Sequence, residues 1–165
     1  MSKADLKKDF GTVALSELNA LYRTALRIVK DHDEAEDAVQ ESLDKGWRNL
    51  EQLEPDARLK PWLFRILTNT CLDHLRLKSR RPTVEFNDED HSSLAPGNWS
   101  QQPDDELQNQ QVGQAIAQQI DDLPEAQQAV VQLVIVEQFS YEDAAVSLDL
   151  PVGTVRSRLS RARAS

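Results

Sequence analysis

With 165 residues, 39% of them hydrophobic and 5% aromatic, the chain can form one ordinary domain or two small ones with modest aliphatic cores. Its net charge of −9 argues against nucleic-acid binding unless the charges are segregated along the chain. The single cysteine excludes an intramolecular disulfide, and neither a signal-peptide core nor an apolar run of roughly 18 residues is present. We therefore expect a cytoplasmic protein without membrane insertion.

Three helices are predicted in the first half of the chain. After a charged, frayed segment at 1–9, apolar residues recur every three to four positions over 10–30, which predicts one core-facing helix. Asp31 to Asp33 then supply an N-cap for a second helix, whose apolar side includes Trp47. A loop follows over 46–60, and Pro61 opens a third helix that continues to about residue 78.

Polar residues on the second and third helices are candidates for binding a partner. Gln40 and Glu41 lie beyond the first helical turn, where the helix dipole no longer explains an acidic residue, although a solvated face is the competing interpretation. The third helix carries a polar, basic stripe beside an aromatic residue, the combination that melted nucleic acid requires. Its members are Trp62, Arg65, Asn69 and Arg76. A core position for Trp62 is an equally weighted alternative.

A flexible linker is predicted over 82–106, which contains no Lys or Arg, three prolines and few large apolar side chains. Helical periodicity resumes near Leu107 and stops at Leu123-Pro124. The next segment contains the run AVVQLVIVEQF, which has the composition of a strand. Its position directly before a helical hairpin nevertheless predicts a buried helix.

The last 26 residues, SYEDAAVSLDLPVGTVRSRLSRARAS, predict a helix-turn-helix. Asp149 tolerates the left-handed turn between the two helices, and Pro151 fixes the start of the second. In that second helix Arg161 points outward from the middle, where it can reach a base, whereas the flanking arginines are placed to meet phosphates. The candidate DNA-binding residues are Arg156, Ser157, Arg158, Ser160, Arg161 and Arg163. A solvated helical hairpin is the alternative.

The charges are strongly segregated along the chain. Residues 82–155 contain 14 acids and no Lys or Arg, whereas 151–165 contain four Arg and no acid. Residues 58–81 contain seven bases and one acid. Two basic patches separated by an acidic stretch are compatible with nucleic-acid binding despite the negative total.

Four ordered blocks resemble the extracytoplasmic-function sigma factors of bacterial RNA polymerase: LYRTALRIVKDHDEAEDAVQESLDKGWRNL, PWLFRILTNTCLDHLR, LPEAQQAVVQL and SYEDAAVSLDLPVGTVRSRLSRARA. The resemblance implies an all-α protein with sigma region 2 at 10–81, an acidic linker at 82–106 and sigma region 4 at 107–165. It further implies a transcription initiation factor that binds core RNA polymerase and promoter DNA. Region 2 would read the minus-ten element and region 4 the minus-thirty-five element, under the control of an anti-sigma factor.

The resemblance also assigns individual residues. Asp37, Gln40 and Glu41 would bind the clamp helices of the largest polymerase subunit, and region 4 would contact the flap of the second largest. The loop at 50–59 would capture a flipped base, and Asn69 matches a promoter-contacting position. In the last helix, the matching contact positions are Arg156, Ser157, Ser160 and Arg161. The ten acids between Pro82 and Glu125 suggest a segment that threads a basic channel of the polymerase.

Two other classes of protein are weighed against this interpretation. A stand-alone helix-turn-helix regulator would use 107–165 alone and would need a ligand pocket or phosphoacceptor domain in 1–81, where neither is indicated. An enzyme is disfavoured because Cys71 and His74 lack the two further ligands of a structural zinc and no glycine-rich phosphate loop occurs. We therefore predict no catalytic activity, no metal and no cofactor, with Cys71 packed in the core.

Overall fold

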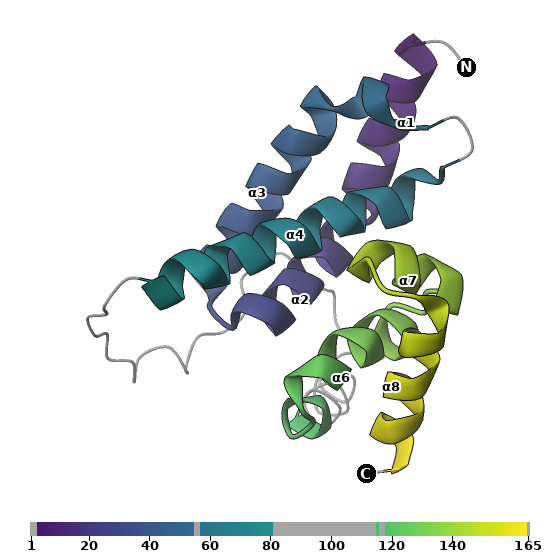
Figure 1. The fold of residues 1–165 in the computed structure, drawn as a ribbon. Helices are drawn as coiled ribbons and strands as arrows, with labels where there is room; N and C mark the ends of the chain where they lie inside the picture. Colours follow the sequence, from purple (N-terminus) through teal and green to yellow (C-terminus); the bar gives the residue numbers. More distant parts are fainter. Residues whose placement is uncertain (1–2, 55–56, 81–114, 116–117, 165) are drawn as a thin grey trace, which may run out of the picture.

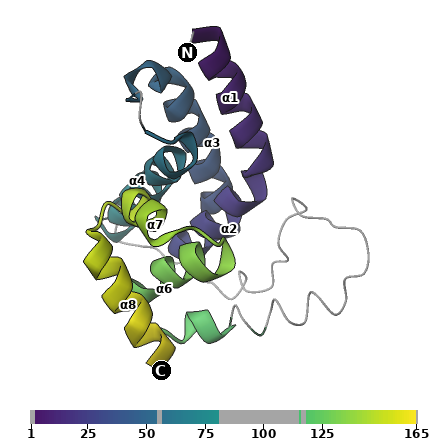
Figure 2. The same ribbon diagram turned by 90° about the vertical axis from the view of Figure 1, so that its right-hand side faces the viewer.

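The computed structural model describes residues 3–54, 57–80, 115 and 118–164, and it contains no strand within those ranges. The all-α prediction is thus confirmed, while the predicted linker at 82–106 lies outside the described residues. No described helix is both long and apolar enough to cross a bilayer. In order, the elements are α1 (Lys3–Ser16), α2 (Leu18–Val29), α3 (His32–Arg48), η1 (Leu50–Gln52), α4 (Leu59–Arg80), α6 (Glu125–Val131), η4 (Gln132–Val136), α7 (Tyr141–Leu148) and α8 (Val152–Ala164), as drawn in Figures 1 and 2.

The start of the chain differs from the prediction. Residues 3–9, expected to be frayed, begin α1, and the single helix predicted over 10–30 is two helices. Glu17, with φ −105° and ψ 11°, leaves helical geometry between them. The reason for the early start is tertiary: Phe10 is buried and its ring lies 5.8 Å from that of Trp47 on α3. Such a contact is not visible in the periodicity of α1 alone.

Helix α3 begins as predicted and ends later than predicted. The side chain of Asp31 accepts a hydrogen bond from the Glu34 N–H at 3.0 Å, which is the expected N-cap. The helix continues to Arg48, through the start of the segment predicted as a loop. Trp47, predicted on the inward side, is 48% exposed because it lies at the end of α3, where its ring meets Phe10 and the Lys7 ammonium of α1.

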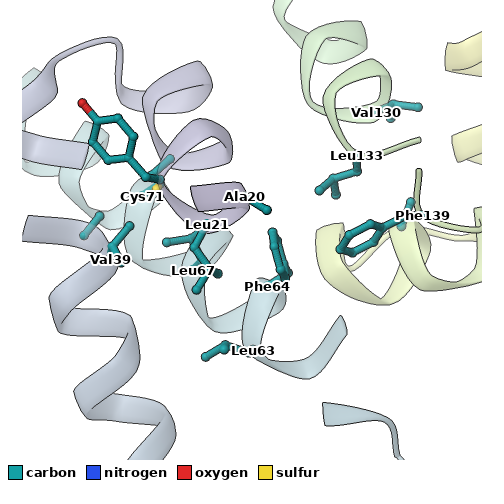
Figure 3. Packing of buried hydrophobic residues seen from close by; sticks show 14 of the residues in the cluster. Ala20, Leu21, Val39, Leu63, Phe64, Leu67, Cys71, Val130, Leu133 and Phe139 are labelled. Carbon is teal, nitrogen blue, oxygen red and sulfur yellow. The ribbon is translucent and has the colours of Figure 1, made fainter. Parts of the chain in front are cut away.

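Helix α4 passes through the centre of the first domain, which comprises α1 to α4. It begins at Leu59, and Pro61 is accommodated because the N–H groups of a first turn need no helical partner. Leu63, Phe64 and Leu67 are fully buried together with Cys71 (Figure 3). Burial raises the pKa of the Cys71 thiol to about 12, so this cysteine is a core residue, as predicted, and an unreactive one.

The second domain comprises α6 to α8. Its apolar run is helical, as predicted, but α6 ends at Val131 and one π-helical turn follows over Gln132–Val136. The wider turn shifts the helical register, so that Leu133 is fully buried while Ile135 is 46% exposed. Gln138, at φ 61°, then reverses the chain toward α7.

The helix-turn-helix forms as predicted. Ser140 caps α7 by accepting a hydrogen bond from the Asp143 N–H at 3.0 Å. Asp149 adopts the left-handed conformation, with φ 58° and ψ 50°. Helix α8 follows Pro151, and Val155 and Leu159 are buried against the rest of the domain.

The two domains pack directly against each other, which the sequence did not predict. Helix α7 lies along α4, and α6 lies beside α2 (Figures 1 and 2). The rings of Phe64 and Phe139 meet edge to face across this boundary, with centroids 4.9 Å apart. A buried hydrogen bond, donated by Thr68 Oγ1 to the carbonyl oxygen of Ser147 at 2.7 Å, also crosses it. The apolar core therefore continues from one domain into the other.

Candidate promoter and polymerase interfaces

The outer face of α8 is exposed and basic. Five of its six candidate DNA-binding residues are solvent-exposed: Arg156, Ser157, Ser160, Arg161 and Arg163. The guanidinium of Arg156 lies over the Tyr141 ring, 5.9 Å from its centroid, which restrains this long side chain beside the recognition face. Such a face, with cations and small hydroxyls, suits the major groove of DNA.

Arg158 is set apart from the other five. It is half-buried and lines a cavity of about 410 Å³ between the two domains. Arg27 and Lys30 of the first domain line the same cavity, together with apolar side chains that include Leu72 and Leu148. The structure thus brings five of the predicted residues together on one surface and places the sixth at the domain boundary.

The polar stripe on α4 is exposed and partly paired. Arg65 Nη2 lies 3.5 Å from the carboxylate of Asp149, in the turn of the helix-turn-helix. Arg76 pairs with Asp73 on its own helix at 2.9 Å, and Asn69 is exposed between these arginines. Trp62 is half-buried and packs against the core. This agrees in part with the interpretation that placed Trp62 in the core.

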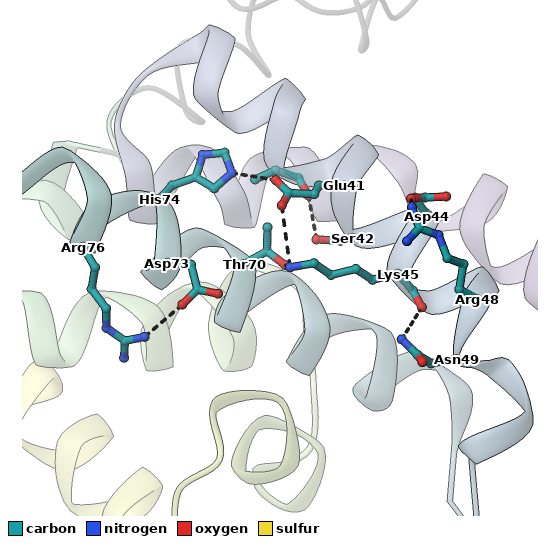
Figure 4. Close-up of polar contacts among 11 residues, drawn as sticks. Glu41, Ser42, Asp44, Lys45, Arg48, Asn49, Thr70, Asp73, His74 and Arg76 are labelled. Carbon is teal, nitrogen blue, oxygen red and sulfur yellow. Dashed lines mark hydrogen bonds and ion pairs between the residues drawn. The ribbon is translucent and has the colours of Figure 1, made fainter.

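The polar face of α3 carries Asp37, Gln40 and Glu41, all exposed. His74 of α4 holds Glu41 through a hydrogen bond of 2.9 Å from its Nε2 to Oε1, and Lys45 lies 3.7 Å from Oε2 (Figure 4). The hydrogen bond from His74, helped by Lys45, lowers the pKa of the Glu41 carboxyl below its ordinary value. Glu41 is therefore a carboxylate of fixed orientation at neutral pH.

The contact of His74 with Glu41, a candidate polymerase-binding residue, was not predicted from the sequence. His74 was considered only as a partner of Cys71 one turn earlier, yet its ring faces Glu41 on another helix. No signal along the chain could reveal this pairing, because the two residues are 33 positions apart. Among the described residues there is no group of three or more His, Cys, Asp or Glu that could hold a metal ion.

Comparison with known proteins agrees with this architecture. The model of sigma-70 region 2 matches residues 14–81, and that of sigma-70 region 4 matches residues 113–165. RNA polymerase sigma-H factor of Pseudomonas aeruginosa is 33% identical over 165 residues, covering 95% of this chain and 83% of the relative. The ECF RNA polymerase sigma-E factor of Haemophilus influenzae is 34% identical over 161 residues, covering 95% of this chain and 85% of the relative.

Two solved structures share the fold. The sigma factor RpoE of Bartonella quintana, in complex with the anti-sigma factor NepR, has a TM-score of 0.67 and 31% identity, covering 95% of this chain and 93% of that one. CnrH, in complex with the cytosolic domain of CnrY, has a TM-score of 0.66, covering 98% of this chain and 89% of that one. Because CnrH is only 24% identical, this similarity concerns the fold alone.

Two helical domains, matched in order by the models of sigma-70 regions 2 and 4, define a sigma-70 family protein. Sigma factors are transcription initiation factors rather than enzymes, and they act with RNA polymerase on promoter DNA. Within that family, the chain belongs to the extracytoplasmic-function sigma factors. It is a factor that directs core polymerase to specific promoters, and a stand-alone regulator is not favoured.

Proposed function

We propose that this sigma factor holds its promoters by two separate surfaces. Residues 10–81 form the minus-ten domain, residues 107–165 form the minus-thirty-five domain, and 82–106 join them. The observation that carries the proposal is the presence of two exposed polar, basic faces on different domains, the outer face of α8 and the stripe on α4. The α8 face contacts major-groove bases and phosphates, while the α4 stripe and the 50–59 loop contact the melted strand.

The polymerase-binding surface is the polar face of α3. Asp37, Gln40 and Glu41 would contact the clamp helices of the largest subunit, and the second domain would contact the flap of the second largest. The orientation of Glu41 by His74 supports this role, because a carboxylate that is already fixed loses less conformational entropy on binding. A solvated face has no need of such a constraint.

An anti-sigma factor is the proposed regulator. RpoE of Bartonella quintana, which is 31% identical with a TM-score of 0.67, was solved in complex with the anti-sigma factor NepR. We expect this chain to have a partner of the same kind, which would cover polymerase- or promoter-binding surfaces and thereby prevent initiation.

Reconstitution with core RNA polymerase, followed by selection of transcribed promoters from a random library, tests the proposal. We expect the protein alone to hold duplex DNA poorly and the holoenzyme to select two conserved elements. Arg161→Ala should alter the upstream element and Asn69→Ala the downstream one, while the exposed α7 residue Glu142 provides a control as Glu142→Gln. Tight promoter binding without polymerase, or one selected element only, would contradict the two-surface model.

A further inference from the structure

We propose that the cavity between the two domains is a binding site for a small amphipathic anion, with a carboxylate or phosphate head and an aliphatic chain. The cavity has a volume of about 410 Å³, which is within the range of sites that hold small organic molecules in proteins. The proposed function assigns this cavity no role.

The walls of the cavity come from both domains. The first domain contributes the end of α2 with the residue that follows it, and the middle of α4 (Figure 1). The second contributes the start of α6, the end of α7 with the turn after it, and α8. Four leucines supply much of the apolar wall: Leu72, Leu75, Leu148 and Leu150. Leu72 is 43% exposed, so an aliphatic chain in the cavity would remove apolar surface from water.

The neutral polar side chains of the walls are already engaged. Thr68 donates its hydroxyl to the carbonyl oxygen of Ser147 at 2.7 Å. The amide nitrogen of Gln128 donates to the Leu123 carbonyl at 2.8 Å, and its amide oxygen accepts from Lys30 Nζ at 2.9 Å. No aromatic side chain lines the cavity among the residues that the structure describes. A sugar would therefore find few hydrogen-bond partners, and a nucleobase no ring to stack on.

The charged side chains of the walls favour an anion. Three cations line the cavity, Arg27, Lys30 and Arg158. Arg27 is paired with Asp121, whereas neither Lys30 nor Arg158 has an ion-pair partner within the described ranges. The one acid in the walls, Glu125, is exposed at the first residue of α6 and pairs with neither of them. The walls therefore keep a positive charge after pairing.

Arg158 is the residue whose surroundings an anion would change most. It is half-buried, and yet it has no hydrogen-bond or ion-pair partner among the described residues. A carboxylate or phosphate offers a guanidinium two charged oxygens in a matching geometry, so an oxyanion head can replace water that Arg158 has lost. Lys30, whose ammonium is held against the amide of Gln128, supplies a second charge in the same cavity.

A ligand in this cavity would contact both domains at once. It would therefore bind most tightly to chains whose two domains are packed together, and by linkage it would oppose any step that separates them. The packing of the domains would thus depend on the concentration of the ligand.

Isothermal titration calorimetry of the full chain tests the site, with decanoate and decyl phosphate as probes below the concentrations at which they form micelles. Decanol has the same chain without the charge, and acetate has the charge without the chain. We expect one molecule of decanoate or decyl phosphate to bind per chain, decanol to bind at least about tenfold more weakly, and acetate not to bind detectably. Binding of only one of the two oxyanions would assign the head group as carboxylate or phosphate.

Substitutions in the walls locate the binding. Arg158→Gln and Lys30→Gln should each weaken binding of the oxyanions by about two- to tenfold, as expected for charge-assisted contacts that stay partly in water. Arg163→Gln makes the same charge change at an exposed position of α8 outside the cavity, so it is the matched control and should bind like the wild type. Glu125→Gln removes the one acid of the walls and should tighten binding by about twofold, a gain that damage to the fold would not produce.

Unchanged helical circular dichroism of each variant excludes unfolding as the cause of a weaker affinity. The proposal would be overturned if neither oxyanion bound, or if decanol bound as tightly as decanoate, because the cations would then have no role. Equal losses of affinity in Arg163→Gln and Arg158→Gln would also overturn it, since binding would then follow the total charge of the chain and not this cavity.

Discussion

At the scale of single residues, the arginines of α8 are not equivalent. Arg161 and Arg163 are both exposed in the last turn of α8, but only Arg161 is predicted to reach a base. We expect Arg161→Ala to cost about 1–3 kcal/mol at one base position and to relax specificity there. Arg163→Ala should weaken binding to all sequences alike and reduce the salt dependence by about one phosphate contact. Equal losses at every base position for Arg161→Ala would refute its role in base reading.

Binding of the holoenzyme to a series of single-base promoter variants measures this difference. The series should start from a promoter selected by the wild type, and each variant protein should be compared with the control Glu142→Gln, at an exposed position of α7.

A second prediction concerns the pH dependence that Glu41 gives to stability. Its pKa is lowered in the folded protein, chiefly by the hydrogen bond from His74, so the stabilisation is present above the ordinary carboxyl pKa and is lost as the pH falls through the folded value. Because Glu41 is about half exposed, Glu41→Gln should lower the free energy of unfolding near pH 7 by no more than about 1 kcal/mol. The difference should vanish in acid, once the pH has fallen below the folded pKa of Glu41.

Urea unfolding of the wild type and of Glu41→Gln, near pH 7 and in acid, measures this difference in the free energy of unfolding. Asp37→Asn, an exposed acid on the same helix, is the matched control and should show no comparable pH-dependent difference. An effect of Glu41→Gln that persists in acid would mean that the substitution acts through packing.

At the scale of elements, Gly46 determines how closely α3 approaches α1 and α4. A Cβ atom there would lie 2.9 Å from Cε2 of Phe10 and 3.3 Å from Cδ1 of Leu63. Gly46→Ala should therefore destabilise the fold by about 1–3 kcal/mol through overpacking. Gly11→Ala on α1, where nothing lies within 4 Å, should instead stabilise it by roughly 0.5–1 kcal/mol. Thermal unfolding of both variants compares them directly, and stabilisation by both would contradict the packing described.

Elements whose boundaries depend on local chemistry could be predicted from the sequence. The N-cap at Asp31 and the left-handed turn at Asp149 each depend on one side chain and its immediate neighbours. The start of α1 and the exposure of Trp47 depend on packing between helices distant in the sequence. The π-helical turn shifts the register of an apolar run that is hydrophobic on all sides, so periodicity could not reveal it.

The same distinction holds for the candidate site. The spacing of the basic residues along α8 and α4 indicated which of them share an exposed face, because helical geometry determines which residues of one helix lie on the same side. Neither the His74–Glu41 pair nor the ion pair between Arg58 and Asp143 could be predicted, since each joins residues separated by long stretches of chain. The placement of Arg158 in the wall of the cavity that Arg27 also lines follows from domain packing in the same way.

At the scale of the whole molecule, the acidic segment 82–106 has a predicted role in the polymerase. It contains seven acids and no Lys or Arg. If it threads a basic channel, replacing its carboxylates by amides should reduce initiation severalfold by removing electrostatic attraction. In vitro transcription from a selected promoter measures this. The control is a variant with seven amide substitutions at exposed acids outside the proposed interfaces: Asp5, Asp9, Asp33, Asp44, Asp122, Glu125 and Glu142. Unchanged transcription would count against the idea.

The edge-to-face contact between Phe64 and Phe139 also gives the closed protein a response to temperature. Separation of the domains exposes this aromatic pair and the neighbouring Leu133 to water, so opening carries a positive heat-capacity change. Apolar attraction weakens on cooling. Dehydration of charged groups such as Arg23 and Glu137, which form an ion pair across the same boundary, becomes less unfavourable on warming. Both effects make the contact between the two domains weaker in the cold.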